Sequence, residues 1–237
     1  MVNIDTVYQK VLALANKEQR GYITPQEFNL FANLAQQDIF EQYFYDLHQF
    51  KRLNDNDNAH TNMQQLIEEK IQFFEVTAGT ATIGTWTGNT NPISKLLPSS
   101  VYRVHRVTYN GRPSEILNTV DFNKTRNSGP LVAPTDARTV CNIRGNRIRL
   151  LGSGGIFLIP GGVVYSRKPN RVNWGYVVVN EKALHDPQSS SNFELHQSEE
   201  PSLVYKILKY AGISIKNPDV TQAGGSMEIS QIQQEKQ

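Results

Sequence analysis

The spacing of apolar residues changes once along this chain, and that change constrains its fold class more than any other feature. From Ile4 to about Phe74, apolar side chains recur every three or four positions, which is the period of an amphipathic helix. From Val101 onward they alternate with polar or basic residues, which is the period of a strand with one buried face. The sequence therefore predicts an α+β protein: an N-terminal helical bundle, a central, mainly antiparallel β domain, and a C-terminal helix with an extended tail.

The predicted domain boundaries follow the same pattern. We expect a helical bundle over residues 1–76, a basic β domain over 77–182, and a C-terminal helix with a flexible arm over 183–237. Within the bundle, helices are expected over 4–17, 25 to about 50, and 63–75, with a polar loop of turn-forming residues over 53–62.

The stretch NKEQRGYITPQEF allows two interpretations. Gly21 and Glu27 stand where a calcium-binding EF-hand loop has its turn glycine and its last ligand. Arg20, however, would place a guanidinium at a ligand position. We therefore favour a helix junction, in which Gly21 ends the first helix and Thr24 and Glu27 form a capping box at the start of the second.

The second helix has apolar residues on more than one face. Its main stripe includes Phe28 and Phe31, whereas Phe40, Phe44 and Tyr45 lie outside that stripe. Two apolar faces indicate either a contact with another subunit or a position between two elements of the same chain. The candidate subunit-interface residues are Phe28, Phe31, Phe40, Phe44 and Tyr45.

The central region is predicted to contain five to seven short strands. Turns are expected at Asn110-Gly111 and Gly145-Asn146, and residues 77–92 are expected to form a short strand and turn or an exposed flap. After it, Ser198 is the expected cap of a helix that ends at Gly212. The polar tail beyond about Lys216 is expected to be disordered alone.

The net charge of +2 conceals a strong segregation along the chain. Residues 101–180 hold 12 Lys or Arg against 3 Asp or Glu, while residues 1–100 hold 7 against 11 and residues 181–237 hold 5 against 8. Arginine is common on exposed strand faces, so any one cluster can be a solvated surface. Three clusters with few acids between them favour a surface for an anionic partner or DNA, formed by Arg103, Arg106, Arg144, Arg147, Arg149, Arg167, Lys168 and Arg171.

No motif in the sequence predicts catalysis, and we expect no enzyme, metal or cofactor. The glycine-rich LGSGGIF is followed by strand-like sequence instead of the helix that a phosphate loop needs. The five histidines are scattered, and the single cysteine, Cys141, is expected to be a buried structural thiol. There is no apolar run that would span a membrane, and the N-terminus has no apolar signal core.

The order of these parts resembles a known class of proteins. A helical hairpin, IDTVYQKVLALANKEQRGYITPQEFNLFANLAQQDIFEQYFYDL, precedes a middle with LPSSVYRVHRVTYNGRP, GNRIRLLG and YSRKP, and the chain closes with FELHQSEEPSLVYKILKYAGISIKNPD and a Gln-rich tail. This arrangement is similar to structural proteins of tailed bacteriophages, in particular the neck and ring proteins of podovirus-type and crAss-like phages. The resemblance covers nearly the whole chain.

The resemblance implies a virion subunit of the phage neck, assembled in the host cytoplasm. It also implies that the C-terminal arm docks on the portal protein and becomes ordered there. The candidate portal-docking residues of this arm are Leu203, Ile207, Ile213, Ile215, Ile229 and Ile232. Such a subunit forms a homo-oligomeric ring of about twelve copies, a dodecamer, that joins the portal protein to other neck or tail proteins and surrounds non-specifically bound double-stranded DNA. DNA channels of such rings are often acidic or mixed, so the basic β domain can instead face another protein. Two alternatives stay open: a nucleic-acid-binding accessory protein that uses a basic β face, and a tail-fibre component.

Overall fold

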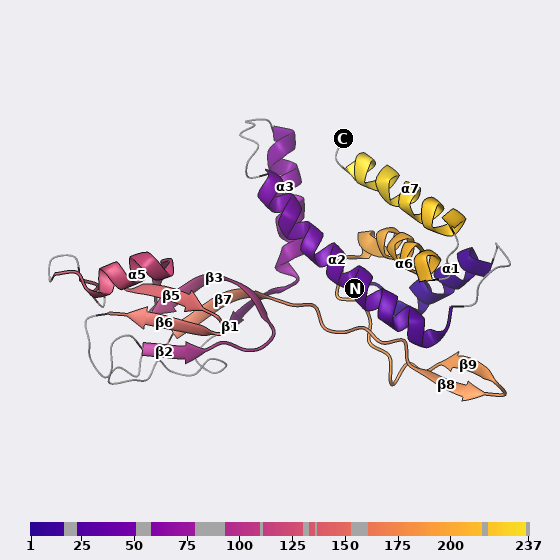
Figure 1. Ribbon diagram of the computed structural model, residues 1–237, viewed down its shortest axis with the longest axis horizontal. Coiled ribbons are helices and arrows are strands. Elements are labelled where there is room, and N and C mark those ends of the chain that lie inside the picture. Colours follow the sequence, from indigo (N-terminus) through magenta and orange to yellow (C-terminus); the bar gives the residue numbers. More distant parts are fainter. Residues whose placement is uncertain are drawn as a thin grey trace. The chain divides into compact units, whose positions relative to one another are not determined.

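The chain forms two compact units, as seen in the computed structural model (Figure 1). The structure describes residues 1–16, 23–50, 58–78, 93–109, 111–129, 133–135, 137–152, 161–214 and 218–235. One unit, here called the helical unit, comprises Met1–Phe73 and Pro169–Gln237; the other, the sheet unit, is Phe74–Lys168. The α+β class is confirmed. The division differs from the three consecutive parts expected, because segments from both ends of the chain pack on one another.

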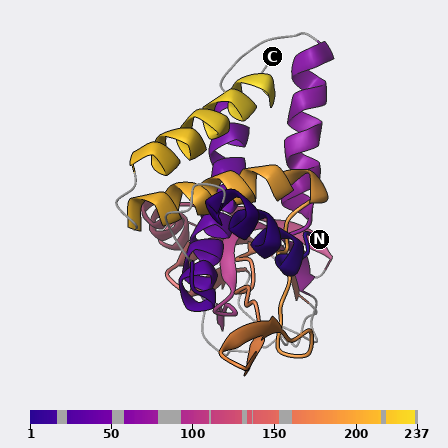
Figure 2. The same ribbon diagram turned by 90° about the vertical axis from the view of Figure 1, so that its right-hand side faces the viewer.

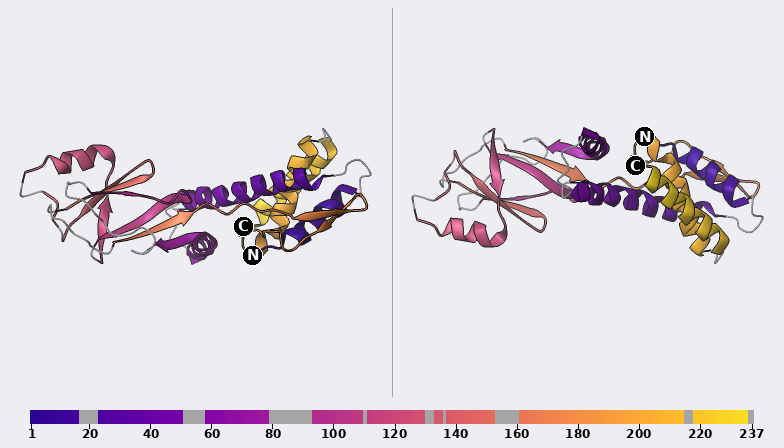
Figure 3. Two further views of the ribbon diagram at one scale, coloured as in Figure 1. Left: turned by 90° about the horizontal axis from the view of Figure 1, so that it is seen from below. Right: turned by 90° about the horizontal axis from the view of Figure 1, so that it is seen from above.

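Five α-helices build the described part of the helical unit. They are α1 (Ile4–Asn16), α2 (Pro25–Phe50), α3 (Asn58–Gln72), α6 (Glu200–Ser214) and α7 (Pro218–Glu235). The long helix α2 contacts α3 and α6, and α6 in turn contacts α1 and α7. Figure 2 shows α7 lying along α6, and Figure 3 shows both chain ends at this unit. The first two helices match the prediction; α3 begins at Asn58, five residues earlier than expected, and ends at Gln72.

The start of α2 has the predicted capping box. The Glu27 backbone amide donates to Thr24 Oγ1 at 3.3 Å, while Glu27 Oε2 accepts from the Thr24 amide at 3.0 Å and from its hydroxyl at 2.8 Å. These bonds satisfy backbone donors that a helix terminus leaves unpaired. Gly21, the expected end of the first helix, and the rest of the candidate calcium loop lie outside the described residues.

Replacing Thr24 with alanine should lower the free energy of unfolding by about 1 kcal/mol, because the N-cap is lost. The Thr24 amide, followed by its hydroxyl, holds the pKa of Glu27 below its ordinary value of 4.5. A carboxyl with a lowered folded-state pKa stabilises the fold above its unfolded pKa, and this contribution disappears as the pH falls through the folded value. The difference in the free energy of unfolding between wild type and Thr24→Ala, measured with urea, should therefore become smaller in acid, where the hydroxyl no longer bonds to a charged Glu27. It should not vanish, because the bond from the Glu27 amide to Thr24 Oγ1 does not titrate. Gln26→Ala is the control, and a difference that stays constant with pH would contradict the assignment.

A segment returning from the sheet unit is fastened along one side of α2 by amide side chains. Asn29 exchanges two hydrogen bonds with the Trp174 backbone, at 2.7 and 3.3 Å, and Asn33 exchanges two with the Val172 backbone, at 3.0 and 2.9 Å. Gln36 donates to the Asn170 carbonyl at 2.8 Å. These three side chains are spaced by four and three residues, so they lie on one face of the helix. We call this set the amide ladder.

The helical unit also contains a two-stranded hairpin, β8 (Tyr176–Val179) and β9 (Lys182–His185). Its turn residues Asn180 and Glu181 both have positive φ, +50° and +62°. Two positive φ angles are typical of the type I′ turn that suits the twist of a hairpin. This strand pair replaces the expected continuation of the β domain to residue 182.

The sheet unit is a seven-stranded sheet of order β1-β7-β3-β4-β5-β6-β2. Among the strand pairs that the described residues form in this sheet, only β4–β5 is parallel. The strands are β1 (Glu75–Ala78), β2 (Ile93–Leu96), β3 (Val101–Tyr109), β4 (Arg112–Ile116), β5 (Val140–Arg144), β6 (Arg147–Leu151) and β7 (Gly161–Arg167). The helix α5 (Thr119–Arg126), which was not predicted, belongs to the crossover that a parallel pair requires. Most of residues 77–92 lie outside the described residues.

One face of the sheet carries the core of this unit. Inward side chains from β3, β5, β6 and β7 form a single cluster, whose buried members include Val107, Tyr109, Cys141, Ile148, Leu150, Val163 and Tyr165. Burial raises the pKa of the Cys141 thiol to about 12, which confirms the expected buried cysteine. Phe122 of α5 covers part of the opposite face, against Val140 and Leu151.

The C-terminal region differs from the prediction at three points. His196, and not Ser198, caps the first turn, since its Nδ1 accepts from the Ser198 amide at 3.2 Å and a short 3-10 helix, Gln197–Glu199, follows. Gly212 lies inside α6, which continues to Ser214. The tail forms α7 instead of a disordered arm, because it finds a packing surface on α6 that its own sequence does not reveal.

Candidate functional site

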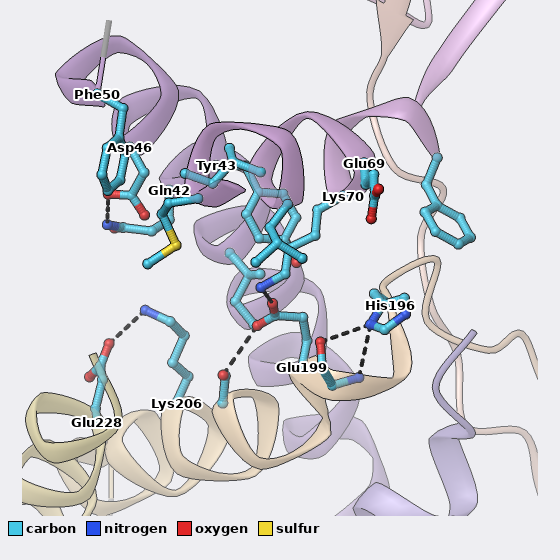
Figure 4. A pocket seen from close by; sticks show the side chains of 17 residues that line it. Gln42, Tyr43, Asp46, Phe50, Glu69, Lys70, His196, Glu199, Lys206 and Glu228 are labelled. Carbon is cyan, nitrogen blue, oxygen red and sulfur yellow. Dashed lines mark hydrogen bonds and ion pairs between the residues drawn. The ribbon is translucent and has the colours of Figure 1, made fainter. Parts of the chain in front are cut away.

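An apolar groove opens in the helical unit between α2, α3, the start of α6 and α7 (Figure 4). Its volume is about 680 Å³. The exposed surface of the groove is mostly apolar, although ten of its seventeen lining residues are polar or charged. The aliphatic and aromatic lining residues are Ile39, Tyr43, Phe50, Met63, Leu66, Ile67 and Phe73. Two of these side chains, Leu66 at 54% and Phe73 at 50%, are half exposed to solvent. An apolar hollow of this size is typical of a site that receives another molecule or segment.

A nearly buried ion pair lies in the wall of the groove. Lys70 Nζ of α3 is 2.5 Å from Glu199 Oε1, and Ser202 Oγ donates to the other carboxylate oxygen at 3.2 Å. The ammonium also lies 5.6 Å from the centre of the Tyr43 ring. Glu199 is only 4% exposed, so its charge depends on these partners. In Figure 4, Lys70 and Glu199 point toward one another from opposite walls.

A second charged cluster fastens α7 to α6 at the end of the groove. Glu228 accepts from Lys206 at 2.6 Å and from Lys209 at 2.9 Å. Burial raises the pKa of Glu228, but the hydrogen bonds and charges of the two lysines outweigh it, so the net pKa is lowered. Tyr210 of α6 donates its hydroxyl to Asp38 of α2, and burial together with this bond raises the pKa of Tyr210. The groove is thus formed by helices that are tied together by buried polar contacts.

The close approach of α7 to α6 depends on Gly224. A Cβ at this position would lie 3.2 Å from the Lys209 backbone nitrogen, whereas a Cβ at Gly225 would meet nothing within 4 Å. Gly224→Leu should therefore separate α7 from α6, and Gly225→Leu should leave it docked, with about 0.5–1 kcal/mol gained from helix propensity. Hydrogen exchange of the α6 and α7 amides measures the difference. Equal protection in both variants would contradict the packing.

The β8–β9 hairpin is the second candidate surface. Val177, Val178, Val179 and Leu184 are all exposed, with Val178 at 64%. Its base, in contrast, is firmly packed: the Trp174 ring stacks on Tyr176 and His185 at 5.8 and 5.7 Å and lies 4.1 Å from Tyr8. Apolar side chains exposed on a well-anchored protrusion are typical of a protein-binding element.

The third candidate surface is the outer face of the sheet, opposite the core. Ile143 and Ile148 are paired and face the core, so the neighbouring pair Arg144 and Arg147 faces outward. On β3, Arg106 pairs with outward Val164 and Arg103 with Ser166, which places both on the same side. The sheet unit holds twelve Lys or Arg against four Asp or Glu, and the helical unit holds twelve against eighteen. The charge segregation of the sequence therefore follows the boundary between the two units.

The arginines of this face have few acidic neighbours. Arg149 donates to Asn142 Oδ1 at 2.8 Å and lies over the Phe122 ring at 5.1 Å. Arg103, Arg106, Arg144 and Arg147 form no ion pair with any described residue. Arg144 and Arg147 stand directly opposite one another, an arrangement of like charges that is unfavourable in isolation. An anionic partner would remove this repulsion.

Several of the other residues predicted as sites are buried in the structure. Phe28 and Phe40 are buried within the helical unit, so they belong to its core and not to a subunit interface. Phe31 and Phe44 are half-buried, and Tyr45 is exposed.

Leu203 and Ile207 are fully buried in α6 and are not part of a docking arm, whereas Ile229 of α7 is exposed. Arg167 and Lys168 end the sheet unit, and Arg171 lies in the helical unit. The side chains of Ile213, Ile215 and Ile232 lie outside the description.

Sequence reasoning missed the hairpin surface and the groove. Three consecutive valines, residues 177–179, fall within the expected β domain over 77–182, and nothing in their sequence distinguishes a buried face from an exposed one. The amide ladder left a clearer signal, since Asn29, Asn33 and Gln36 repeat at helical spacing on a helix that is otherwise apolar there. Such a polar row indicates that a backbone segment runs beside the helix.

Other kinds of site find no support in the described part of the chain. There, no group of three or more His, Cys, Asp or Glu is placed to hold a metal ion. None of the described helices has the length and hydropathy to cross a membrane. No protein-family model matches the sequence, and no curated protein matches it.

Proposed function

We propose that the chain is a structural subunit of a bacteriophage virion, one copy in a head-to-tail connector ring that joins the portal protein to the tail and surrounds the DNA. The observation that carries the proposal is the β8–β9 hairpin. It exposes four aliphatic side chains on a base fixed by stacked aromatic rings. A monomer gains nothing from such a surface, whereas a subunit of an assembly buries it.

The sheet unit supports the same proposal by its charge. A connector needs a part that meets DNA or an acidic neighbouring protein, and the outer face of the sheet carries arginines with few acidic neighbours. The helical unit, with its excess of acids, is the part that meets other copies and the portal. The resemblance in the order of its parts to neck and ring proteins suggests the type of assembly.

The mass of the purified protein in solution tests the proposal. We expect a closed assembly of about twelve subunits at low and moderate salt, visible as rings by electron microscopy. If the chain alone is monomeric, rings should form when portal protein is added, and removal of residues 218–235 shows whether α7 takes part. A chain that stays monomeric with portal present would contradict the proposal.

A second candidate function is that of a nucleic-acid-binding accessory protein, favoured by Arg103, Arg106, Arg144 and Arg147, which form no ion pair with a described residue. Binding through phosphates depends steeply on salt, with log K falling by about 0.9 per neutralised phosphate for each unit of log salt. Arg144→Ala together with Arg147→Ala should then reduce the slope by about 2. Fluorescence anisotropy with random-sequence duplex DNA measures it. Lys10→Ala, in α1 of the helical unit, is the control and should leave the slope unchanged.

A further inference from the structure

We propose that the β8–β9 hairpin of one copy of the chain inserts into the apolar groove of a second copy. The inference rests on the proposed function, because it names the contact through which identical subunits join. It uses two surfaces of the helical unit that the described residues of the same copy leave exposed: the hairpin valines, and the hollow between α3 and α6 with Leu66 and Phe73 at its opening.

The two surfaces lie at opposite ends of α2, so one copy cannot join them. Asn29, near the beginning of the helix, holds the hairpin base through Trp174, whereas Tyr43, near its end, lines the groove. The helix rises about 1.5 Å per residue, which places these positions about 21 Å apart. The hairpin strands have four residues each and reach only about 13 Å. The hairpin can therefore fill only the groove of a neighbour.

The chemistry of the two surfaces is complementary. Val177 pairs with Leu184 across the hairpin and shares a face with Val179, while Val178 lies on the other face. Both faces of the hairpin are therefore apolar, and its turn is formed by Asn180 and Glu181. The aliphatic and aromatic side chains that α2 and α3 contribute to the groove suit these faces. Burying the four half-exposed side chains removes apolar surface from water and so favours association.

Charges at the edge of the contact match as well. Lys182 begins β9 and is exposed, and Glu69 lies at the rim of the groove, where Figure 4 shows it on α3. Neither forms an ion pair with a residue that the structure describes. Lys182 can pair with Glu69 when the hairpin is inserted, while the exposed Glu181 in the same turn has to stay in solvent.

The arrangement has a consequence for symmetry. A protrusion at one end of α2 and a hollow at the other make a heterologous contact, in which each copy donates a hairpin and receives one. Repetition of such a contact produces a closed ring when its rotation divides the circle, and an open filament otherwise. A contact between two hairpins would instead give a two-fold dimer and stop there.

Disulfide trapping between full-length variants tests the contact. Val178→Cys and Leu66→Cys proteins are prepared separately, mixed in equal amounts and oxidised. Cys141 will not interfere, since it is buried and its pKa is raised to about 12. We expect cross-linked dimers containing one copy of each variant. The matched control is Val178→Cys mixed with Leu30→Cys, because Leu30 is 70% exposed on the same α2 but does not line the groove.

A charge placed on the hairpin gives an independent readout. Val178→Asp should weaken self-association at least tenfold, as measured by sedimentation. Val120→Asp should leave it unchanged, since Val120 of α5 is equally exposed, at 63% against 64%, but lies in the sheet unit. Far-UV circular dichroism checks that both variants are folded.

The outcomes separate this contact from the proposed function. Rings that form without the Val178–Leu66 cross-link, or that tolerate Val178→Asp, would overturn the contact and leave the ring proposal standing. Cross-linked open filaments without rings would support the contact and contradict the connector ring. Predominant cross-linking of Val178→Cys with itself, or equal cross-linking to Leu30→Cys, would overturn the contact in favour of paired hairpins or random collision.

Discussion

Replacing Trp174 with alanine is expected to lower the free energy of unfolding by about 3–5 kcal/mol, the range for truncating a buried tryptophan. The side chain is 2% exposed, and its ring contacts Tyr8 of α1 and the hairpin residues Tyr176 and His185. Its Nε1 donates to Asp5 Oδ1 at 2.9 Å. Truncation therefore leaves a cavity and removes the link between α1 and the base of the hairpin.

Urea unfolding followed by far-UV circular dichroism measures this loss. Trp174→Phe retains an aromatic ring but cannot donate to Asp5, so it should cost less than the alanine variant. Val178→Ala, on the exposed part of the same hairpin, is the control and should change stability by less than about 0.5 kcal/mol. A Trp174→Ala protein as stable as the control would show that the aromatic cluster does not hold the hairpin.

Replacing Lys70 with methionine is expected to destabilise the helical unit by about 3 kcal/mol, because it leaves the Glu199 carboxylate buried without its cation. The reverse change, Glu199→Gln, should cost less. Lys70 has a side chain that is 25% exposed, so its ammonium can reach water, whereas the Glu199 side chain is 6% exposed and cannot. The difference in destabilisation between the two variants follows from the burial of the charge that is left behind, and not from the strength of the bond.

The double variant Lys70→Met with Glu199→Gln makes the explanation testable. Removing both charges eliminates the unpaired buried carboxylate, so the double variant should be more stable than Lys70→Met alone. Lys10→Met is the matched control, since Lys10 pairs with Glu200 at a more exposed position and should contribute less than about 1 kcal/mol. Additive effects of the two single changes would mean that the pair is not coupled.

The elements that could be predicted are those determined by local sequence. The capping box at Thr24 and Glu27 and the turn glycines Gly111 and Gly145 depend on residues within a few positions of one another, and they occur where expected. The period of apolar residues likewise identified α1, α2 and the strand pairs β3–β4 and β5–β6. These features need no knowledge of what lies across the fold.

The errors arose where a distant segment decides the outcome. The tail is helical because Gly224 lets α7 approach α6 and Glu228 meets two lysines there, which no property of the tail alone indicates. Phe40 lies outside the main apolar stripe but is buried all the same, because α2 is covered on more than one side. The basic sheet face was identified by composition, while the groove and the hairpin required the packing of both ends of the chain.

The route of the chain between its units has a consequence for how such a protein can be built. The chain leaves the helical unit after Phe73 and returns at Pro169. The first strand of the sheet unit, β1, begins beside the end of its last strand, β7, where the Arg167 amide donates to the Phe74 carbonyl at 2.9 Å. A segment whose two ends are adjacent is an insertion that a host domain tolerates without strain. The sheet unit is therefore inserted between two segments of the helical unit. Its surface can be exchanged or reshaped for a new neighbour, while the helices that hold the hairpin and the groove keep their sequence.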